Sequence, residues 1–312
     1  MGNWPQVTVL GSLNMDISVT VPRLPEPGAT VLGSAARFTA GGKGANQAVA
    51  AARLGATVHM AGCVGDDDFG RQLLASLREE GVDAAGVRTV AGVPTGLAMI
   101  SVDHAGENLI TVAPGANHEV GPAEVGAVAF AAAGGLPGDV LVICAEIPVP
   151  AIRSALSRKV HCVLNLAPAP PEAAAIVADG VDWLVVNETE AAAVLGRPVS
   201  GLRDAGQAAT ALVTAGARHA VVTAGAHGAA LSGPGTAHTI AAFRVQAVDS
   251  VGAGDTFVGA LAVALAAGVP AAEAVRAAAA AGATAATRPG AQAGMPRPAD
   301  IRVATGLTWP VG

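Results

Sequence analysis

The segment Asp249-Ser-Val-Gly-Ala-Gly-Asp-Thr-Phe257 leads directly into an apolar stretch, TFVGALAVALAAGVPAA, at residues 256–272. A helix that begins here would point the backbone amides of Gly252 to Asp255 at one spot in front of its positive end. The glycines of this turn let a ligand approach the backbone closely, which an ordinary helix cap does not require. We therefore expect a buried helix whose first turn forms an anion hole.

The same segment argues against two other structures. It is not a dinucleotide-binding fingerprint, because Phe257 stands where G-x-G-x-x-G needs its last glycine. It is not a membrane span either, since Asp255 and Glu273 bound the apolar stretch. Gly268 and Pro270 interrupt it before it reaches the roughly 20 apolar residues that a bilayer requires.

Elsewhere in the chain, short apolar runs rich in β-branched residues alternate with helical stretches. The runs predict strands at 7–10, 57–64, 140–145, 160–166, 182–186 and 219–224, with helices such as 44–54 and 69–80 between them. Continuous apolar runs are typical of strands buried on both faces. The expected fold class is α/β, with a doubly wound, mostly parallel sheet flanked by helices.

Two segments, 17–40 and 93–113, alternate apolar and polar residues around turn-forming sequences. This pattern predicts hairpins with one solvated face. We expect them to form a small antiparallel β-sheet lid, discontinuous in sequence, on a single domain that spans residues 1–312. Exposed apolar strands favour association, so we expect a homodimer in which two lids pack on each other. The apolar side chains concerned are Ile17, Val19, Val21, Leu97, Met99 and Ile100.

Composition narrows the possible partners and location. Of 312 residues, 52% are hydrophobic and 13% are charged, which suits a well-packed globular protein with a formal net charge of −6. The only lysines are Lys43 and Lys159, and without a basic cluster we expect no nucleic acid partner. Cys63, Cys144 and Cys162 stand singly in apolar runs, as reduced thiols do. Because the first residues show no signal-peptide pattern, we expect a cytoplasmic protein that binds no membrane.

Three further segments follow predicted strands, where open α/β sheets bind ligands. Asn14 and Asp16 either hydrogen-bond adjacent hydroxyls of a polyol or stabilise a turn. The loop 41–46, Gly-Gly-Lys-Gly-Ala-Asn, opens a helix and suits an oxygen-rich or anionic ligand. It is not a Walker A loop, because no Ser or Thr follows its lysine. Asn187 and Glu190 fit a helix cap, and equally a site for nucleotide phosphates and magnesium.

Together these segments predict phosphoryl transfer. Transfer of a γ-phosphoryl group needs a charge sink and a positioned acceptor hydroxyl, with little covalent chemistry. The amides of Gly252, Ala253, Gly254 and Asp255 would supply the sink, and the Asp255 carboxylate can accept the hydroxyl proton as general base. The lid would exclude water, which competes as an acceptor.

Five motifs occur in the order and spacing of the ribokinase/phosphofructokinase-B family of carbohydrate kinases. They are Asn14-x-Asp16, Gly41-Gly-Lys-Gly-Ala-Asn46, Asn187-Glu-Thr-Glu190, Thr223-Ala-Gly-Ala-His-Gly228 and Gly252-Ala-Gly-Asp255. The chain resembles this family from about residue 7 to about residue 298. Strings at 243–249 and 287–292 resemble members that act on ribose. The resemblance therefore implies phosphorylation of D-ribose at its 5-hydroxyl by ATP, giving ribose 5-phosphate and ADP.

The resemblance also implies residue roles. Asp255 would be the catalytic base, and the sugar would be held by Asn14, Asp16, Gly42, Lys43, Gly44, Ala45, Asn46 and Glu146. The nucleotide would contact Asn187, Thr223, Ala224, Gly225, Ala226, His227, Gly228, Gly254 and Ala279. Mg²⁺ would enter with ATP near Glu190. K⁺, as an activating cation, would bind beside the anion hole at Asp249, Val251, Ala285, Arg288, Gly290 and Gly294.

Some positions depart from the family pattern. Val251 replaces a more usual Thr and Gly294 a Ser, changes that carbonyl ligands of a cation survive but side-chain ligands do not. Ala279 stands where a polar residue near the adenine is common. The strength of the potassium requirement and the nucleotide selectivity therefore stay open.

Alternatives remain beside ribose phosphorylation. A kinase of the same family acting on another sugar or a nucleoside would share these motifs. Asp16 favours a small sugar, because a carboxylate accepts from two neighbouring hydroxyls. A 2-deoxy sugar would leave it partly unpaired, at a cost of about 1–3 kcal/mol. A non-catalytic sugar sensor would have no need of Asp255, and a nicotinamide oxidoreductase would need a glycine fingerprint where residues 11–14 read Gly-Ser-Leu-Asn.

Overall fold

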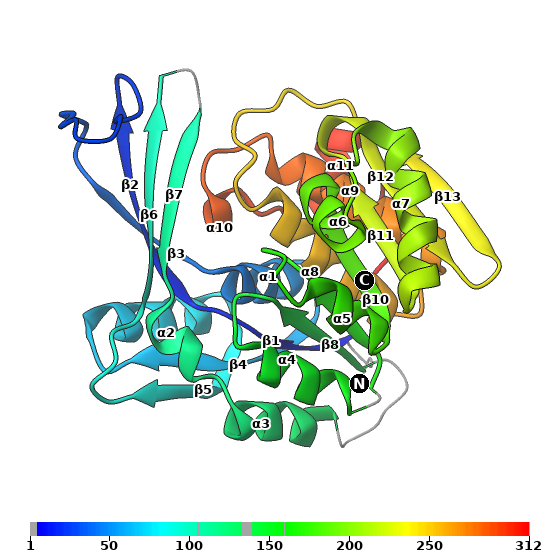
Figure 1. The fold of residues 1–312 in the computed structure, drawn as a ribbon, viewed down its shortest axis with the longest axis horizontal. Helices are drawn as coiled ribbons and strands as arrows, with labels where there is room; N and C mark the ends of the chain where they lie inside the picture. Colours follow the sequence, from blue (N-terminus) through cyan, green and yellow to red (C-terminus); the bar gives the residue numbers. More distant parts are fainter. Residues whose placement is uncertain (1–4, 105–106, 133–138, 159, 312) are drawn as a thin grey trace.

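The computed structural model describes residues 5–104, 107–132, 139–158 and 160–311. A nine-stranded central sheet carries helices on both faces, and a four-stranded sheet projects from one end of it (Figure 1). The tip of the second predicted hairpin, 105–106, lies outside the described residues. Within the described ranges, no helix is both long and apolar enough to cross a membrane.

The central sheet has the strand order β13-β12-β11-β10-β9-β8-β1-β4-β5. Neighbours from β11 to β5 run parallel, whereas β12 and β13 form an antiparallel edge. The strands are β1 Gln6–Leu10, β4 Thr57–Gly65, β5 Asp83–Val90, β8 Asp139–Cys144, β9 Cys162–Asn165, β10 Val181–Asn187, β11 Ala217–Thr223, β12 Gly228–Gly233 and β13 Thr236–Ala241. The predicted fold class is confirmed. The edge strands β5 and β13, and β12 next to β13, were not predicted, because none of them carries a long apolar run.

The small sheet has the order β3-β2-β6-β7, built from β2 Asn14–Val21, β3 Arg37–Gly41, β6 Gly96–Asp103 and β7 Asn108–Ala113. Both predicted hairpins are present, but the expected all-antiparallel sheet is wrong, because β2 and β6 pair in parallel from Asn14–Gly96 to Val21–Asp103. The reason is topological. The chain enters β2 from β1 and β6 from β5, two strands that run parallel in the central sheet, so both hairpins leave that sheet in the same direction.

Eleven α-helices surround the central sheet in the described part of the chain. They are α1 Lys43–Arg53, α2 Asp68–Glu79, α3 Pro122–Ala132, α4 Val149–Leu156, α5 Ala173–Ala178, α6 Glu188–Leu195, α7 Gly201–Ala215, α8 Ala253–Ala266, α9 Ala271–Ala285, α10 Ala291–Gly294 and α11 Pro298–Thr305. One hydrophobic core unites α1, α2, α8, α9 and α11 with one face of the sheet. A second core unites α3 to α7 with the other face. The sheet is thus covered on both sides, as the continuous apolar strands predict.

Helix α8 is the apolar helix expected from the sequence, and all its residues from Asp255 to Ala266 are buried. A helix that is apolar all round must be enclosed by other elements. Gly259 allows α1 to come close, since a Cβ there would lie 2.7 Å from the Gln47 carbonyl oxygen and 2.8 Å from the Ala50 Cβ. The contact between α1 and α8 brings the first turns of both helices together.

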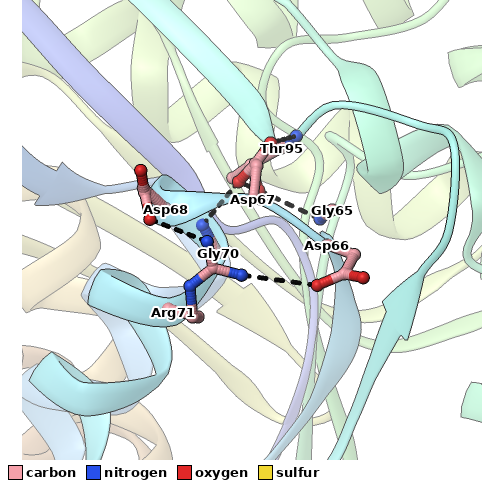
Figure 2. Close-up of polar contacts among 7 residues, drawn as sticks. All are labelled: Gly65, Asp66, Asp67, Asp68, Gly70, Arg71 and Thr95. Atoms are coloured by element: carbon pink, nitrogen blue, oxygen red, sulfur yellow. Dashed lines mark hydrogen bonds and ion pairs between the residues drawn. The ribbon is translucent and has the colours of Figure 1, made fainter.

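The small sheet is attached to the main body through Asp67 (Figure 2). Its carboxylate caps α2 by accepting from the Gly70 amide at 2.8 Å, and it also accepts from the Thr95 amide at 2.7 Å and the Thr95 Oγ1 at 2.6 Å. The Thr95 Oγ1 in turn accepts from the Gly65 amide at 3.0 Å. Because Thr95 directly precedes β6, this network holds the root of the small sheet.

Replacing Asp67 with Ala removes the cap of α2 and the acceptor for Thr95 together. We expect Asp67→Ala to lower the free energy of unfolding at pH 7 by about 1–2 kcal/mol, measured by urea denaturation. The control is Asp68→Ala, whose 87% exposed side chain pairs with Arg71 at the surface. It is expected to change stability by less than about 0.5 kcal/mol.

The loss in Asp67→Ala should depend on pH. Burial disfavours the ionised carboxylate, but the hydrogen bonds from Thr95 and Gly70 outweigh it and lower the pKa of Asp67. A lowered folded-state pKa stabilises the fold above the unfolded-state pKa, and this contribution is lost as pH falls through the folded value. The stability gap between wild type and Asp67→Ala should therefore shrink below about pH 4. A gap that stays constant or widens in acid would contradict this account.

Candidate active site

A cavity of about 200 Å³ lies where β10, β11, α1 and α8 meet, at the carboxyl ends of the strands. Besides Asn165, which the sequence did not single out, its lining includes residues from four of the segments described above. These residues are Lys43, Asn187, Glu190, Thr223, Gly252 and Asp255. The structure thus brings together groups that are more than 200 residues apart in the chain.

The first turn of α8 forms one wall of this cavity. Gly252 has a φ of 76°, in the left-handed region that favours glycine, and a Cβ there would lie 2.9 Å from the Ala291 Cα. The amide of Ala253 donates to the Ser250 carbonyl oxygen at 3.2 Å. In the described part of the chain the amides of Gly254 and Asp255 have no acceptor, so they are the donors that remain available to an anion.

The Asp255 carboxylate is buried, and two consecutive side chains of α1 hold it. Oδ2 accepts from Asn46 Nδ2 at 2.9 Å, and Oδ1 accepts from Gln47 Nε2 at 3.2 Å. The Asn46 Oδ1 is itself fixed by Gln292 Nε2 at 3.1 Å. Asp255 is therefore an acceptor of defined orientation at the edge of the cavity.

Asp255 shares this space with two further acidic groups, Asp16 and Glu146, and with the ammonium group of Lys43. Burial is the main cause that raises the pKa of Asp16 to about 7, the nearby carboxylates of Glu146 and Asp255 raise it further, and Lys43 opposes them. The charge of Asp255 is the main cause that raises the pKa of Lys43, against the effect of burial. A ligand rich in hydroxyl donors would relieve the crowding of these acceptors.

The carboxylate of Glu146 lies within the same cluster. Its Oε2 accepts from the Ser12 Oγ at 2.6 Å and from the Lys43 backbone amide at 3.3 Å. The Asn14 Oδ1 accepts from the Asn117 Nδ2 at 2.7 Å, so the side-chain amide nitrogen of Asn14 is the group that could donate to a ligand. At Gly41 a Cβ would collide with the Asp16 carboxylate, so a glycine at this position leaves the room that the carboxylate occupies.

Asn187 and Glu190 form a capping box at the start of α6. The Asn187 Oδ1 accepts from the Glu190 amide at 2.9 Å, and the Glu190 Oε2 accepts from the Asn187 amide at 2.8 Å. The cap predicted from the sequence is thus present, and both residues also line the cavity. Burial raises the pKa of Glu190, partly offset by its hydrogen bond from Asn187 and by Lys43.

Of the other residues predicted to contact the nucleotide, those at 224–228 and Ala279 do not line the cavity. Thr223 ends β11 at the cavity, and the following residues form a short 3-10 turn, η2 Gly225–His227, before β12. Ala279 lies in the middle of α9, where it is partly buried against the core. Of this group, Thr223 is the member that lines the cavity.

The predicted cation loop lies beside the start of α8. Asp249 accepts from the Val251 amide at 3.0 Å and from the Gly290 amide at 2.8 Å. The carbonyl oxygens of Ala285 and Arg288 both lie 3.2 Å from the position that a Cβ of Gly294 would occupy, so they converge on one point. Converging carbonyls fit a hard cation such as K⁺. Among the described residues, no group of three or more His, Cys, Asp or Glu side chains could hold a metal ion.

The sequence analysis did not identify the buried polar side chains that hydrogen-bond the site residues or their neighbours. Ser12, Gln47, Asn117 and Asn165 are all buried, and each hydrogen-bonds a residue of the site or its neighbour. One signal was available at Gln47, a polar residue within the alanine-rich segment 45–52 of a helix. Its partners cannot be read from the sequence, because they lie on distant elements.

The sequence is similar to those of known carbohydrate kinases. The chain matches the pfkB family carbohydrate kinases over residues 5–298. It is 37% identical over 298 residues to ribokinase of Haemophilus influenzae, covering 93% of this chain and 95% of that protein. It is 38% identical over 295 residues to ribokinase of Bacillus subtilis, covering 93% of this chain and 96% of that protein.

A solved structure extends this likeness to three dimensions. The structure of Arabidopsis thaliana ribokinase complexed with ribose and ATP is similar with a TM-score of 0.81 at 29% identity, covering 98% of this chain and 100% of that one. Both the sequence match and the shared fold span nearly the whole length. The chain belongs to the pfkB family of carbohydrate kinases.

Proposed function

We propose that this sugar kinase transfers the γ-phosphoryl group of ATP to the 5-hydroxyl of D-ribose, giving D-ribose 5-phosphate and ADP. The observation that carries the proposal is the buried Asp255 carboxylate, held by α1 next to the free amides of the first turn of α8. The relatives that are ribokinases support ribose as the sugar.

The sugar would lie against the acidic cluster. Asp16 and Glu146 would accept hydrogen bonds from its hydroxyl groups, while Asn14 and Lys43 would donate to its oxygens, so that the 5-hydroxyl faces Asp255. Gly42, Gly44, Ala45 and Asn46 complete this wall through the start of α1. Asp255 then takes the hydroxyl proton as the new O–P bond forms.

The phosphates would lie over the first turn of α8. The amides of Gly254 and Asp255 stabilise the charge of the transferred group, and Lys43 supplies a cation on the opposite side. Mg²⁺ that accompanies ATP would neutralise its phosphates near Glu190, through water. Asn187, Gly254, Ala279 and the segment 223–228 would border the nucleotide.

A monovalent cation would hold the loop that precedes α8. The donors would be Asp249 and the carbonyl groups of Val251, Ala285, Arg288, Gly290 and Gly294. The side chain of Arg288 is itself a cation and pairs with Asp300 at 2.7 Å, so the donor from this residue would be its carbonyl oxygen. Equal turnover in potassium and in sodium buffers would contradict this part of the proposal.

We also propose a cytoplasmic homodimer that forms through the small sheets. Large apolar side chains are exposed on both faces of this sheet, Phe38, Met99 and Leu109 on one face and Ile110 and Val112 on the other. Val21, which the sequence suggested for this surface, is instead buried. Exposed apolar side chains gathered on one face in this way favour an interface. A monomeric mass at micromolar concentration in sedimentation would contradict the dimer.

Asp255→Asn tests the role of the base. The variant keeps the shape and polarity of the side chain but accepts no proton, so we expect kcat for ribose to fall by about 10²–10⁴-fold. Ribose binding by calorimetry should stay within a few-fold. Asp66→Asn, a surface variant, serves as the control in a coupled ADP-release assay. A kcat of Asp255→Asn within tenfold of wild type would exclude Asp255 as the base.

Ribose binding without turnover in the wild type would instead favour a sugar sensor.

The raised pKa of Asp16 predicts a pH dependence of ribose capture. Only the ionised carboxylate accepts from two hydroxyls, and a pKa of about 7 means that protonation removes this form as pH falls through 7. We therefore expect kcat/KM for ribose to drop by about tenfold per pH unit well below pH 7. Asp16→Asn should have a low kcat/KM without this acid limb. An unchanged acid limb in the variant would assign the titration to another group.

A further inference from the structure

Gln47 is a fully buried polar residue on α1 that none of the roles above includes. Its neighbours from Gly44 to Ala51 on this helix are buried as well. Its side chain is enclosed by the protein, with no exposed surface, so it cannot touch a substrate. Any contribution to the reaction must pass through the groups it contacts.

Those contacts lead directly to the proposed base. Nε2 donates to Asn165 Oδ1 at 2.9 Å and to Asp255 Oδ1 at 3.2 Å. Both protons of the amide are thus used, one on β9 and one on α8. Gln47 joins three elements that meet beneath the cavity.

The orientation of this amide follows from its partners. Asn165 Nδ2 donates to the Val185 carbonyl oxygen at 3.2 Å, and a carbonyl only accepts. Asn165 therefore presents its Oδ1, an acceptor, to Gln47. The atom of Gln47 that faces it must be the donor, Nε2. The same nitrogen then faces Asp255 and attracts its carboxylate, whereas the amide oxygen would repel it.

This arrangement has a cost that packing does not explain. The Oε1 of Gln47 is buried without a hydrogen-bond partner in the described part of the chain. A buried unpaired carbonyl oxygen destabilises a fold, and an apolar side chain of similar size would avoid the penalty. An apolar side chain could supply neither the donor to Asn165 nor the donor to Asp255, and the second of these acts on the proposed base.

We infer that Gln47 is a positioning residue, which together with Asn46 holds the plane of the Asp255 carboxylate so that the base faces the acceptor hydroxyl. The inference rests on the proposed function of Asp255. Asn46 binds Oδ2 and Gln47 binds Oδ1, so each oxygen is fixed by one donor and keeps a lone pair for the incoming proton. Small errors in the position of a catalytic group reduce rates by large factors.

The test compares Gln47→Met with wild type in the ADP-release assay. Met preserves the volume but removes the donor, so we expect kcat to fall by about 10–100-fold while KM for ribose changes by less than about threefold. The melting temperature should change little, because the substitution removes the unpaired Oε1 but takes the donor away from Asn165 Oδ1. Gln72→Met, the same change on the exposed face of α2, should leave all these values unaltered. Gln47→Glu puts a carboxylate against Asp255 and should lower kcat at least as much as Gln47→Met does. This variant replaces Gln47→Met in the test if the Met variant does not fold.

A double-mutant cycle shows whether the effect passes through Asp255. In single-turnover measurements of ribose 5-phosphate formation, adding Gln47→Met to Asp255→Asn should cost less than about twofold. A full additive loss, a kcat of Gln47→Met within twofold of wild type, or a lower melting temperature with raised KM would each overturn the inference. If Asp255→Asn alone kept the wild-type kcat, the proposed function would fail and this inference with it.

Discussion

The packing of α8 against α1 is the constraint on which the rest of the site depends. Twelve consecutive residues of α8 are buried, and Gly259 allows the backbone of α1 to come within van der Waals distance. The first turns of the two helices therefore lie together beyond the carboxyl ends of the strands. This contact lets Asn46 and Gln47 reach Asp255, which is more than 200 residues away in the chain.

The site places several buried carboxylates, which accept hydrogen bonds, close to one another, and this lowers the stability of the folded protein. Burial and neighbouring carboxylates keep the pKa of Asp16 near 7, so the stability of the free protein falls between about pH 4 and pH 7, where the unfolded chain releases this proton and the folded protein retains it. Lys43 is the ammonium group that offsets the cluster, and the charge of Asp255 is what holds its pKa high. Such a cluster is best explained by the ligand that completes it, since hydroxyl donors satisfy carboxylates that the protein leaves crowded.

The sequence predicts much of this fold because the local patterns are strong. Continuous apolar runs marked the parallel strands, and alternation marked both hairpins within a few residues. The parallel pairing of β2 with β6 was missed, because register between distant hairpins is set by the central sheet rather than by local pattern. The motifs pointed to Asn14, Lys43 and Asp255 as site residues, whereas no motif pointed to Gln47. Its partners depend on how α1, β9 and α8 pack, which no spacing in the sequence reveals.

The identity of the product tests the central claim most directly. Incubation of the enzyme with ribose, ATP and Mg²⁺ should give one sugar phosphate, whose ³¹P–¹H and ³¹P–¹³C couplings in NMR place the phosphate on the carbon-5 oxygen. The account predicts D-ribose 5-phosphate in amounts equal to the ADP formed. A phosphate on another hydroxyl would contradict the placement of the sugar against Asp255. Release of inorganic phosphate without a sugar phosphate would contradict the transfer itself.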